Sequence, residues 1–149
     1  MRGFEIISEY LDKNIEIPTR KTIFSAGYDL ASAVDIKIEP NEVKLVPTGL
    51  KAYMQKDEVL MIYIRSSIAV KCGLMLMNNV GIIDADYYNN EKNEGHIFAP
   101  IKNLSDSPFF IKKGERIAQG IFQKYLLVDN DNFENGKKRI GGFGSTNLS

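Results

Sequence analysis

The feature that most constrains this fold is a period-two alternation of apolar and polar residues, repeated in short runs. In one such run, Val34, Ile36 and Ile38 alternate with charged residues, which is the pattern of a strand with one buried face. Proline, asparagine and glycine lie between the runs and favour tight turns. We expect strands over residues 3–7, 34–38, 43–45, 49–54, 59–64, 74–77, 80–83, 96–101, 109–111 and 116–123.

Short, closely spaced strands favour an all-β fold, a jelly-roll-like sandwich or barrel, over alternating strands and helices. Helical periodicity remains only at residues 66–73, where a serine N-cap and Gly73 would bracket one short helix. From Asp129 onward the chain is polar and then rich in glycine. We therefore divide the chain into a β domain, 1–128, and a flexible C-terminal arm, 129–149.

Composition excludes several classes of function. A chain of 149 residues is about one domain, and its 19 basic residues balance 19 acidic ones, so no overall positive field predicts a nucleic-acid partner. No apolar stretch approaches the roughly 20 residues of a membrane-spanning helix. A single cysteine, Cys72, and a single histidine, His96, exclude an intrachain disulfide and a structural zinc site. We expect a cytoplasmic protein in which Cys72 packs in the interior and His96 starts a strand.

Arg65, Ser66 and Ser67 follow an apolar strand and open the predicted helix. The N–H groups at a helix N-terminus attract anions, and a guanidinium can bind phosphate oxygens through two N–H groups at once. These residues therefore predict a phosphate site. The alternative is that the serines only cap the helix and that the arginine lies on the surface.

Two carboxylates, Asp84 and Asp86, and the aromatic Tyr87 follow the strand at residues 80–83. In an extended chain both carboxylates would share one face, with Tyr87 on the other. A carboxylate at a strand end can activate a water, while an aromatic ring packs on a base or a sugar. The same residues are also ordinary at a turn, so both interpretations stay open.

Three further segments combine glycine with polar or charged side chains. Asp29 lies at the entry to a strand and could orient magnesium-bound waters, although turns use the same residue types. Residues 114–120 carry Gln119 and also fit a simple hairpin. The arm joins three cations at residues 137–139 to a glycine-rich end with Phe143, which suits phosphate contacts and stacking on a base or a merely solubilising tail.

Taken in order, these segments resemble the five motifs of the homotrimeric dUTP pyrophosphatase (dUTPase) family. The matching residues are 26–30, 65–67, 81–87, 114–119 and 141–146. Each motif alone is weakly specific, whereas five in order are strongly specific. The resemblance implies a jelly-roll-like homotrimer whose active sites lie between subunits, each completed by the C-terminal arm of a neighbour.

The resemblance also implies a role for individual residues in the hydrolysis of dUTP to dUMP and pyrophosphate. Asp84 would activate the water that attacks the α-phosphorus. Tyr87 would pack on the deoxyribose and exclude a 2′-hydroxyl. Asn78 and the hairpin backbone that includes Gly81 would bind the uracil edge, and Phe143 would lie over the base.

Contacts to the phosphates are the second part of what the resemblance implies. Asp29 would support the water shell of Mg²⁺. The residues expected to hold the triphosphate are Arg65, Ser66, Ser67, Gln119 and, in the arm, Lys138, Arg139, Gly144, Ser145 and Thr146. Lys138 stands where the family usually has an arginine, and either Lys138 or Arg139 would serve the γ-phosphate.

Two alternatives to hydrolysis remain on the same fold. A dCTP deaminase has a segment similar to residues 65–67, but deamination is expected to need a glutamate in the strand after the third motif, and residues 96–101 hold none. A nucleotide-sensing regulatory protein would need a surface for its partner. Residues 88–94 replace the arginine–glycine pair usual in the family and indicate a longer loop that could be such a surface.

Overall fold

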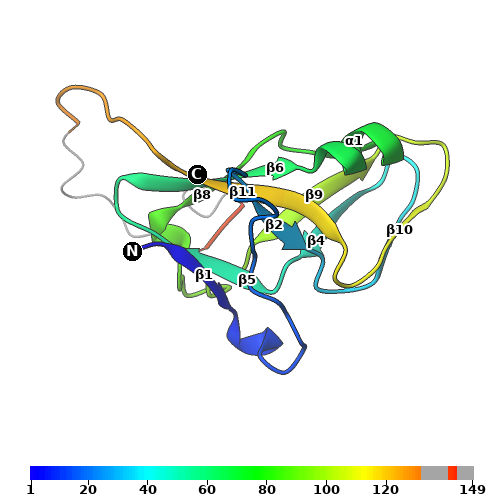
Figure 1. Ribbon diagram of the computed structural model, residues 1–149, viewed down its shortest axis with the longest axis horizontal. Coiled ribbons are helices and arrows are strands. Elements are labelled where there is room, and N and C mark those ends of the chain that lie inside the picture. The colour runs from blue at the N-terminus through cyan, green and yellow to red at the C-terminus, as the bar shows by residue number, and fades with distance from the viewer. Residues whose placement is uncertain (132–140, 144–149) are drawn as a thin grey trace.

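The computed structural model describes residues 1–131 and 141–143, and Figure 1 shows how their strands are arranged. The strands are β1 (Gly3–Ile6), β2 (Tyr28–Ala31), β3 (Ile36–Ile38), β4 (Val43–Pro47), β5 (Leu50–Tyr53), β6 (Glu58–Ile64), β7 (Leu74–Leu76), β8 (Gly81–Asp84), β9 (Phe98–Asn103), β10 (Phe109–Ile111) and β11 (Arg116–Lys124). One helix, α1 (Ser66–Cys72), and two 3₁₀ turns, η1 (Ser8–Tyr10) and η2 (Ala85–Tyr87), complete the elements of these residues. The predicted all-β fold with one short helix is therefore confirmed.

All the strand pairs are antiparallel and form small sheets. The largest has the order β2-β11-β6-β8, a second has the order β4-β9-β7, and β1-β5 and β10-β3 pair separately. Within the described residues these sheets do not close into a barrel, and they are consistent with the jelly-roll-like sandwich that the sequence predicts. The turn at Asn41, with a φ of 64°, joins β3 to β4, yet these two strands lie in different sheets.

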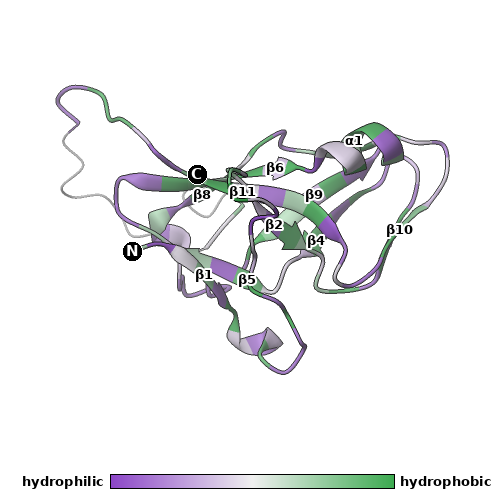
Figure 2. Cartoon of the chain, viewed as in Figure 1, coloured by the Kyte–Doolittle hydropathy of each residue, from purple (hydrophilic) through white to green (hydrophobic). Residues whose placement is uncertain are grey.

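The core is made of the inward-facing residues of several sheets. Leu30 of β2, Leu60 of β6 and Ile117 of β11 are fully buried, as are Val46 of β4 and Ile101 of β9. Figure 2 shows that β11 carries both hydrophobic and hydrophilic residues. Burying apolar surface at about 25 cal/mol per Å² is the main term that holds such layers together, so the alternation decides which face of each strand points inward.

The helix α1 begins one residue earlier than it would with Ser66 as its N-cap. Its N-cap is Arg65, whose backbone is extended (φ −71°, ψ 137°), and Ser66 is the first helical residue, so the predicted serine N-cap was wrong. The cause is that the Arg65 N–H donates to the carbonyl of Ile117 at 3.2 Å and so prolongs the sheet beyond β6. At the other end Gly73 has a φ of 66°, which confirms the predicted glycine cap. Cys72 packs against the core, as expected.

The chain leaves the sheet after β11. In Figure 1 residues 125–131 extend away from the strands, and the side chain of Leu126 is 97% exposed. Only residues 141–143 of the remaining arm are described. The predictions for Lys138, Arg139, Gly144, Ser145 and Thr146 therefore lie outside the described residues. Over the residues that the structure describes, there is no helix with the length and apolar character needed to span a membrane.

Candidate functional site

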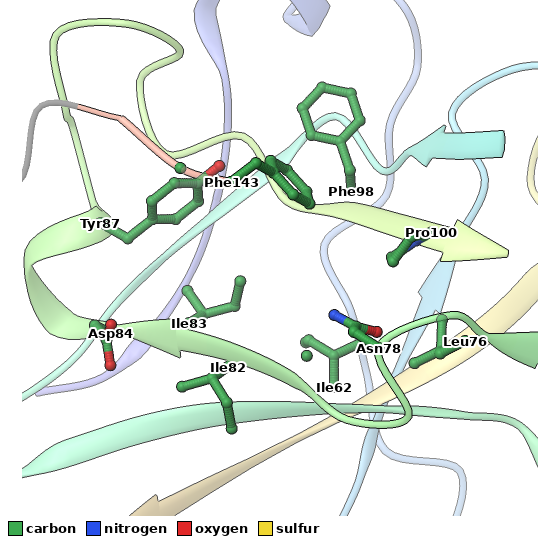
Figure 3. A pocket seen from close by; sticks show the side chains of 12 residues that line it. Ile62, Leu76, Asn78, Ile82, Ile83, Asp84, Tyr87, Phe98, Pro100 and Phe143 are labelled. Carbon is green, nitrogen blue, oxygen red and sulfur yellow. The ribbon is translucent and has the colours of Figure 1, made fainter. Parts of the chain in front are cut away.

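A pocket of about 160 Å³ lies beside β8 and β9 (Figure 3). It takes its walls from β6, β7, β8, η2 and β9 and from the described part of the arm. The pocket brings together five predicted site residues, Asn78, Gly81, Asp84, Tyr87 and Phe143. Its other lining residues are Ile62, Leu76, Ile82, Ile83, Phe98, Pro100 and Gly142. A largely apolar hollow with a few polar groups is the usual form of a small-molecule site.

The hairpin between β7 and β8 forms one end of this pocket. Asn79 adopts a φ of 60°, and the Val80 N–H donates to the carbonyl of Asn78 at 2.7 Å, so the turn is tight. Gly81 opens β8, and a Cβ there would lie 3.1 Å from the Cβ of Ile62. Without that Cβ the hairpin backbone stays accessible from the pocket, and the Asn78 side chain is seen beside Ile62 in Figure 3.

The two carboxylates after β8 have different environments. The strand ends at Asp84, and residues 85–87 form the 3₁₀ turn η2. Asp84 is half-buried and lines the pocket, whereas Asp86 is exposed and does not. Of the two interpretations, the turn is therefore confirmed and the extended chain is not. Because a 3₁₀ turn has three residues per turn, Asp84 and Asp86 do not share one face as they would in a strand. Asp84 is the acid that the described residues contribute to the pocket lining.

Tyr87 forms an aromatic wall of the pocket. Its side chain is only 5% exposed, and its hydroxyl donates to the carbonyl of His96 at 2.7 Å while it accepts from the Nδ2 of Asn93 at 2.8 Å. The ring is therefore held at its far end. A ring held in this way packs against a flat or cyclic ligand with its face or its edge.

The described part of the arm lies on this aromatic wall. A Cβ on Gly142 would lie 2.9 Å from the Cε2 of Tyr87, so the backbone approaches the ring more closely than any other residue type would allow. Phe143 borders the pocket with its ring centroid 6.5 Å from that of Phe98, at an interplanar angle of 66° (Figure 3). Both contacts are made to the pocket of the same chain.

A second hollow, of about 460 Å³, lies where β2, β6 and β11 meet the start of α1. Its lining residues are Lys21, Ser25, Ala26, Gly27, Asp29, Arg65, Ser66, Ser67 and Gln119. Strand pairing explains the assembly, because Gln119 of β11 lies opposite Asp29 of β2 and Arg65 directly follows β6. A Cβ on Gly27 would lie 2.5 Å from the Oε1 of Gln119, so the side-chain amide of Gln119 occupies space that any other residue at position 27 would fill. The predicted phosphate residues of the described chain are therefore brought together.

Asp29 lies between two guanidinium groups in this second hollow. Its Oδ1 is 3.4 Å from the Nε of Arg65, and its Oδ2 is 3.6 Å from the Nη1 of Arg116. The Asp29 and Arg65 side chains are largely buried, at 17% and 26% exposure. Lys21 and Arg65 line this hollow with Asp29, so its cationic side chains outnumber its carboxylate and it suits an anion with several charged oxygens.

The described residues do not form a protein cage for a metal ion. In residues 1–131 and 141–143 there is no group of three or more histidine, cysteine, aspartate or glutamate side chains placed to hold one. Mg²⁺ is commonly bound through substrate phosphates and waters with only one or two carboxylates from the protein. Asp29 offers a carboxylate of that kind beside the anion hollow, and its contact with magnesium-bound water stays a prediction.

Asp84 of the pocket and Arg65 of the cationic hollow lie at opposite ends of one strand. Asp84 pairs with Val59 near the start of β6, while Arg65 directly follows the end of this strand. At about 3.3 Å per residue, the separation along the strand is roughly 20 Å. One chain therefore presents its carboxylate pocket and its cationic hollow as two separate half-sites.

Residues 88–94 are tied to the first strands of the protein. The Glu94 carboxylate accepts from the backbone N–H of Ser8 at 3.1 Å and from the Nζ of Lys51 at 2.8 Å. The Tyr88 hydroxyl donates to the Oε2 of Glu5 at 2.7 Å. The polar side chains of Tyr88 and Glu94 therefore form hydrogen bonds within the chain. That this loop binds a protein partner stays a prediction.

His96 is a buried hydrogen-bond acceptor beside the pocket. It precedes β9, which begins at Phe98, so the predicted place at a strand start was wrong. Its Nε2 accepts from the backbone N–H of Gly49 at 2.9 Å, and its ring centroid lies 4.1 Å from that of Phe98. Burial lowers the pKa of His96 to about 4, so the neutral ring is the form that accepts this hydrogen bond.

Sequence reasoning missed several residues of both hollows. Phe98 and Pro100 line the pocket from β9, and Lys21 lines the anion hollow from a loop. Apolar residues in a strand look like core residues in a sequence, and a lysine in a loop looks like a surface residue. Asn93 was also missed, because an asparagine in a polar loop looks like a surface residue in a sequence.

Comparison with known proteins gives the chain's relatives. The profile of the dUTPase family matches residues 13–147. A deoxyuridine 5′-triphosphate nucleotidohydrolase of Lactococcus lactis is 51% identical over 146 residues, which cover 98% of this chain and 97% of that protein. A protein of the same name from Desulfitobacterium hafniense is 35% identical over 144 residues, or 93% and 91% of the two chains.

Solved structures agree with these relatives. The crystal structure of a dUTPase from Streptococcus mutans has a TM-score of 0.81 and 52% sequence identity, and the match covers 85% of this chain and 98% of that one. A G164S mutant of the dUTPase of Staphylococcus bacteriophage 80alpha, solved with dUpNHpp, has a TM-score of 0.71 and 25% identity over 99% of both chains. The match therefore extends over the β domain and both hollows.

Proposed function

This chain belongs to the dUTPase family, and we propose that it hydrolyses dUTP to dUMP and pyrophosphate with Asp84 as the general base. Asp84 takes a proton from a water whose oxygen forms a bond to the α-phosphorus. The bond from that phosphorus to the oxygen bridging it to the β-phosphorus breaks, and pyrophosphate leaves. The observation that carries the proposal is that one pocket holds Asp84, Asn78 and Tyr87 together.

The pocket suits a pyrimidine deoxynucleoside. Asn78 and the backbone around Gly81 offer amide groups at the closed hairpin end, which match the edge of uracil. A 5-methyl group would have to enter the same tight hairpin, so thymine is excluded by space. The Tyr87 ring packs on the sugar and excludes a 2′-hydroxyl, while Phe143 covers the base.

The cationic hollow suits the triphosphate. Arg65, Ser66, Ser67 and Gln119 would bind the phosphate oxygens, and Asp29 holds the guanidinium of Arg65 in place. A positioned cation stabilises the negative charge that develops on the phosphoryl oxygens during attack. In the arm, Lys138 or Arg139 would bind the γ-phosphate, and Gly144, Ser145 and Thr146 would add further contacts to the phosphates.

Mg²⁺ would enter with the triphosphate. It supplies charge neutralisation and orientation of the phosphate oxygens when bound. Asp29 is the residue that would accept hydrogen bonds from its water shell. This arrangement is supported by the position of the Asp29 carboxylate in the anion hollow.

We further propose that each active site forms between copies of the chain in a homotrimer. The roughly 20 Å along β6 between the two half-sites supports this, because a water activated by Asp84 must act on a phosphate bound beside Arg65. A second copy can place its own Arg65 opposite the first copy's Asp84. The arm would then cover a neighbour's site through the contacts that Gly142 and Phe143 make here with their own chain.

The two alternatives have less support. Deamination of dCTP is disfavoured because β9 contributes Phe98 and Pro100 to the pocket and contains no glutamate. A regulatory partner at residues 88–94 is compatible with hydrolysis and would contact the exposed side chains of Glu91 and Lys92. We also place the chain in the cytoplasm, where a reducing environment suits its single thiol.

Release of pyrophosphate tests the proposed function. We expect the purified protein with Mg²⁺ to release pyrophosphate from dUTP and to leave dCTP, dTTP and UTP largely intact. Equal turnover of UTP would contradict the role of Tyr87. Release of ammonia from dCTP would support the deaminase instead, and absence of any turnover of dUTP would reject the proposal.

A further inference from the structure

The hydroxyl of Tyr87 is held by two hydrogen bonds that leave its proton directed away from the pocket. It donates to the carbonyl of His96 at 2.7 Å and accepts from the Nδ2 of Asn93 at 2.8 Å. The side chain is 5% exposed. Because a phenol has a single proton to donate, Tyr87 meets a sugar with its ring.

Asn93 is itself held by the loop that follows Tyr87. Its Oδ1 accepts from the Nδ2 of Asn90 at 2.7 Å and from the backbone N–H of Gly95 at 3.1 Å. Asn90 also donates from its Nδ2 to the Tyr87 carbonyl at 2.8 Å. The residue 90–95 loop therefore fixes both the backbone and the hydroxyl of Tyr87.

The tight turn at Gly95 completes this support. Its φ is 87°, and a Cβ there would lie 2.8 Å from the carbonyl oxygen of Tyr87. Asn90 is buried at 6% exposure, and its Oδ1 accepts from the backbone N–H groups of Lys92 and Asn93. A partly buried network of hydrogen-bonded polar groups favours one geometry, because a buried group that loses its partner is costly.

We propose that Asn93 is a positioning residue that sets the discrimination between deoxyribose and ribose through Tyr87. The inference rests on the proposed function. Ribose differs from deoxyribose by one oxygen atom at C2′. A tyrosine ring can therefore exclude ribose by steric contact only if the ring cannot move aside. Asn93 supplies that rigidity from outside the pocket. Loss of its Nδ2 donor lets the ring move and admits UTP.

The test compares kcat/KM for UTP and dUTP in the full chain. We expect Asn93→Ala to raise the ratio of UTP to dUTP turnover about tenfold, the change that corresponds to about 1.4 kcal/mol. The matched control is Glu94→Gln, which weakens the attachment of the same loop to Ser8 and Lys51 but keeps every hydrogen bond of Tyr87. We expect this control to leave the ratio unchanged, and thermal unfolding shows whether both variants are folded.

Several results would overturn the inference. An unchanged ratio in folded Asn93→Ala would do so, and so would an equal rise in Glu94→Gln, since loop loosening alone would then suffice. If Asn93→Ala does not fold, Tyr87→Phe removes both hydrogen bonds and keeps the ring, and a ratio like that of the parent protein would reject the proposal. If the parent protein does not hydrolyse dUTP, that result rejects the proposed function itself, and with it this inference.

Discussion

At the scale of single residues, His96 shows how burial gives a side chain a role that its type does not suggest. The imidazole accepts a hydrogen bond from Gly49 and packs between Tyr10 and Phe98. Its carbonyl also receives the Tyr87 hydroxyl. The chain's single histidine therefore supports the pocket wall through both its ring and its backbone.

Protonation of His96 should weaken the fold in mild acid. Its pKa is lowered by burial from 6.5 to about 4, so the unfolded chain binds a proton between these values that the folded chain does not. The free energy of unfolding therefore falls as the pH falls from 6.5 toward 4, by at most about 3 kcal/mol. Urea unfolding at pH 7.0, 5.5 and 4.5 measures the effect.

The matched variant for this prediction is His96→Gln, which keeps a hydrogen-bond acceptor and removes the titration. Its unfolding free energy should change much less over the same pH range. Glu58, whose pKa beside Arg2 is lowered from 4.5 to about 2, adds a slope only at the acid end of this range, and that slope is the same in both proteins. An identical slope in both proteins would contradict the assignment to His96.

At the scale of elements, the sequence predicted what depends on local pattern. Short runs rich in apolar residues located β6 and β11 to within a residue, and Gly73 marked the end of α1 correctly. The turn after Asp84 was one of two interpretations that stayed open, because a 3₁₀ turn there depends on packing with distant residues and has no periodic signal. The same holds for the start of α1, which is set by the hydrogen bond between Arg65 and Ile117.

The candidate site was predictable as residue types but not as an arrangement. Matches to the family motifs identified Asn78, Asp84 and Tyr87, which share one pocket. The supporting residues, Phe98 and Asn93, act through contacts made across the fold, and nothing in their local sequence distinguishes them from core or loop residues. Local sequence pattern therefore identifies the catalytic and binding residues better than it identifies the residues that position them.

The arm can be tested as an element at Gly142. A Cβ there would lie 2.9 Å from the Tyr87 ring, which is held by hydrogen bonds and cannot retreat, so Gly142→Ala should displace the arm. We expect kcat/KM for dUTP to fall at least tenfold, because small errors in positioning cost much of the rate. The melting temperature should be unchanged, since the core is untouched.

The control for the arm variant is Asp131→Ala, at an exposed position in the same segment. Its kcat/KM should equal that of the parent protein. Equal activity in Gly142→Ala and in the control would show that the contact between arm and Tyr87 has no part in turnover.

At the scale of the whole molecule, the separation of the two half-sites means that the proposed hydrolysis requires more than one copy of the chain. Asp84 and Arg65 lie at opposite ends of β6, so a monomer would not bring the general base to a phosphate bound beside Arg65. In the proposed trimer, Asp84 of one chain lies opposite Arg65 of a neighbouring chain. Activity should therefore require an intact Asp84 and an intact Arg65 on different copies.

Mixing two inactive variants tests this directly. Asp84→Asn and Arg65→Ala should each lose most activity alone, because each lacks one half of every site. Co-expressed at equal amounts, they should form mixed trimers in which about one quarter of the sites combine an intact Asp84 with an intact Arg65. Activity no higher than the sum of the two variants alone would place both residues of a site on one chain.

The measurement closest to the central claim is single-turnover hydrolysis of dUTP by Asp84→Asn, set beside its affinity for a non-hydrolysable dUTP analogue. A general base contributes about 10²–10⁴-fold to the rate, so we predict a loss of at least that size with the analogue bound almost as tightly as by the parent protein. A variant that turns over dUTP within a few-fold of the parent rate would show that another group activates the water.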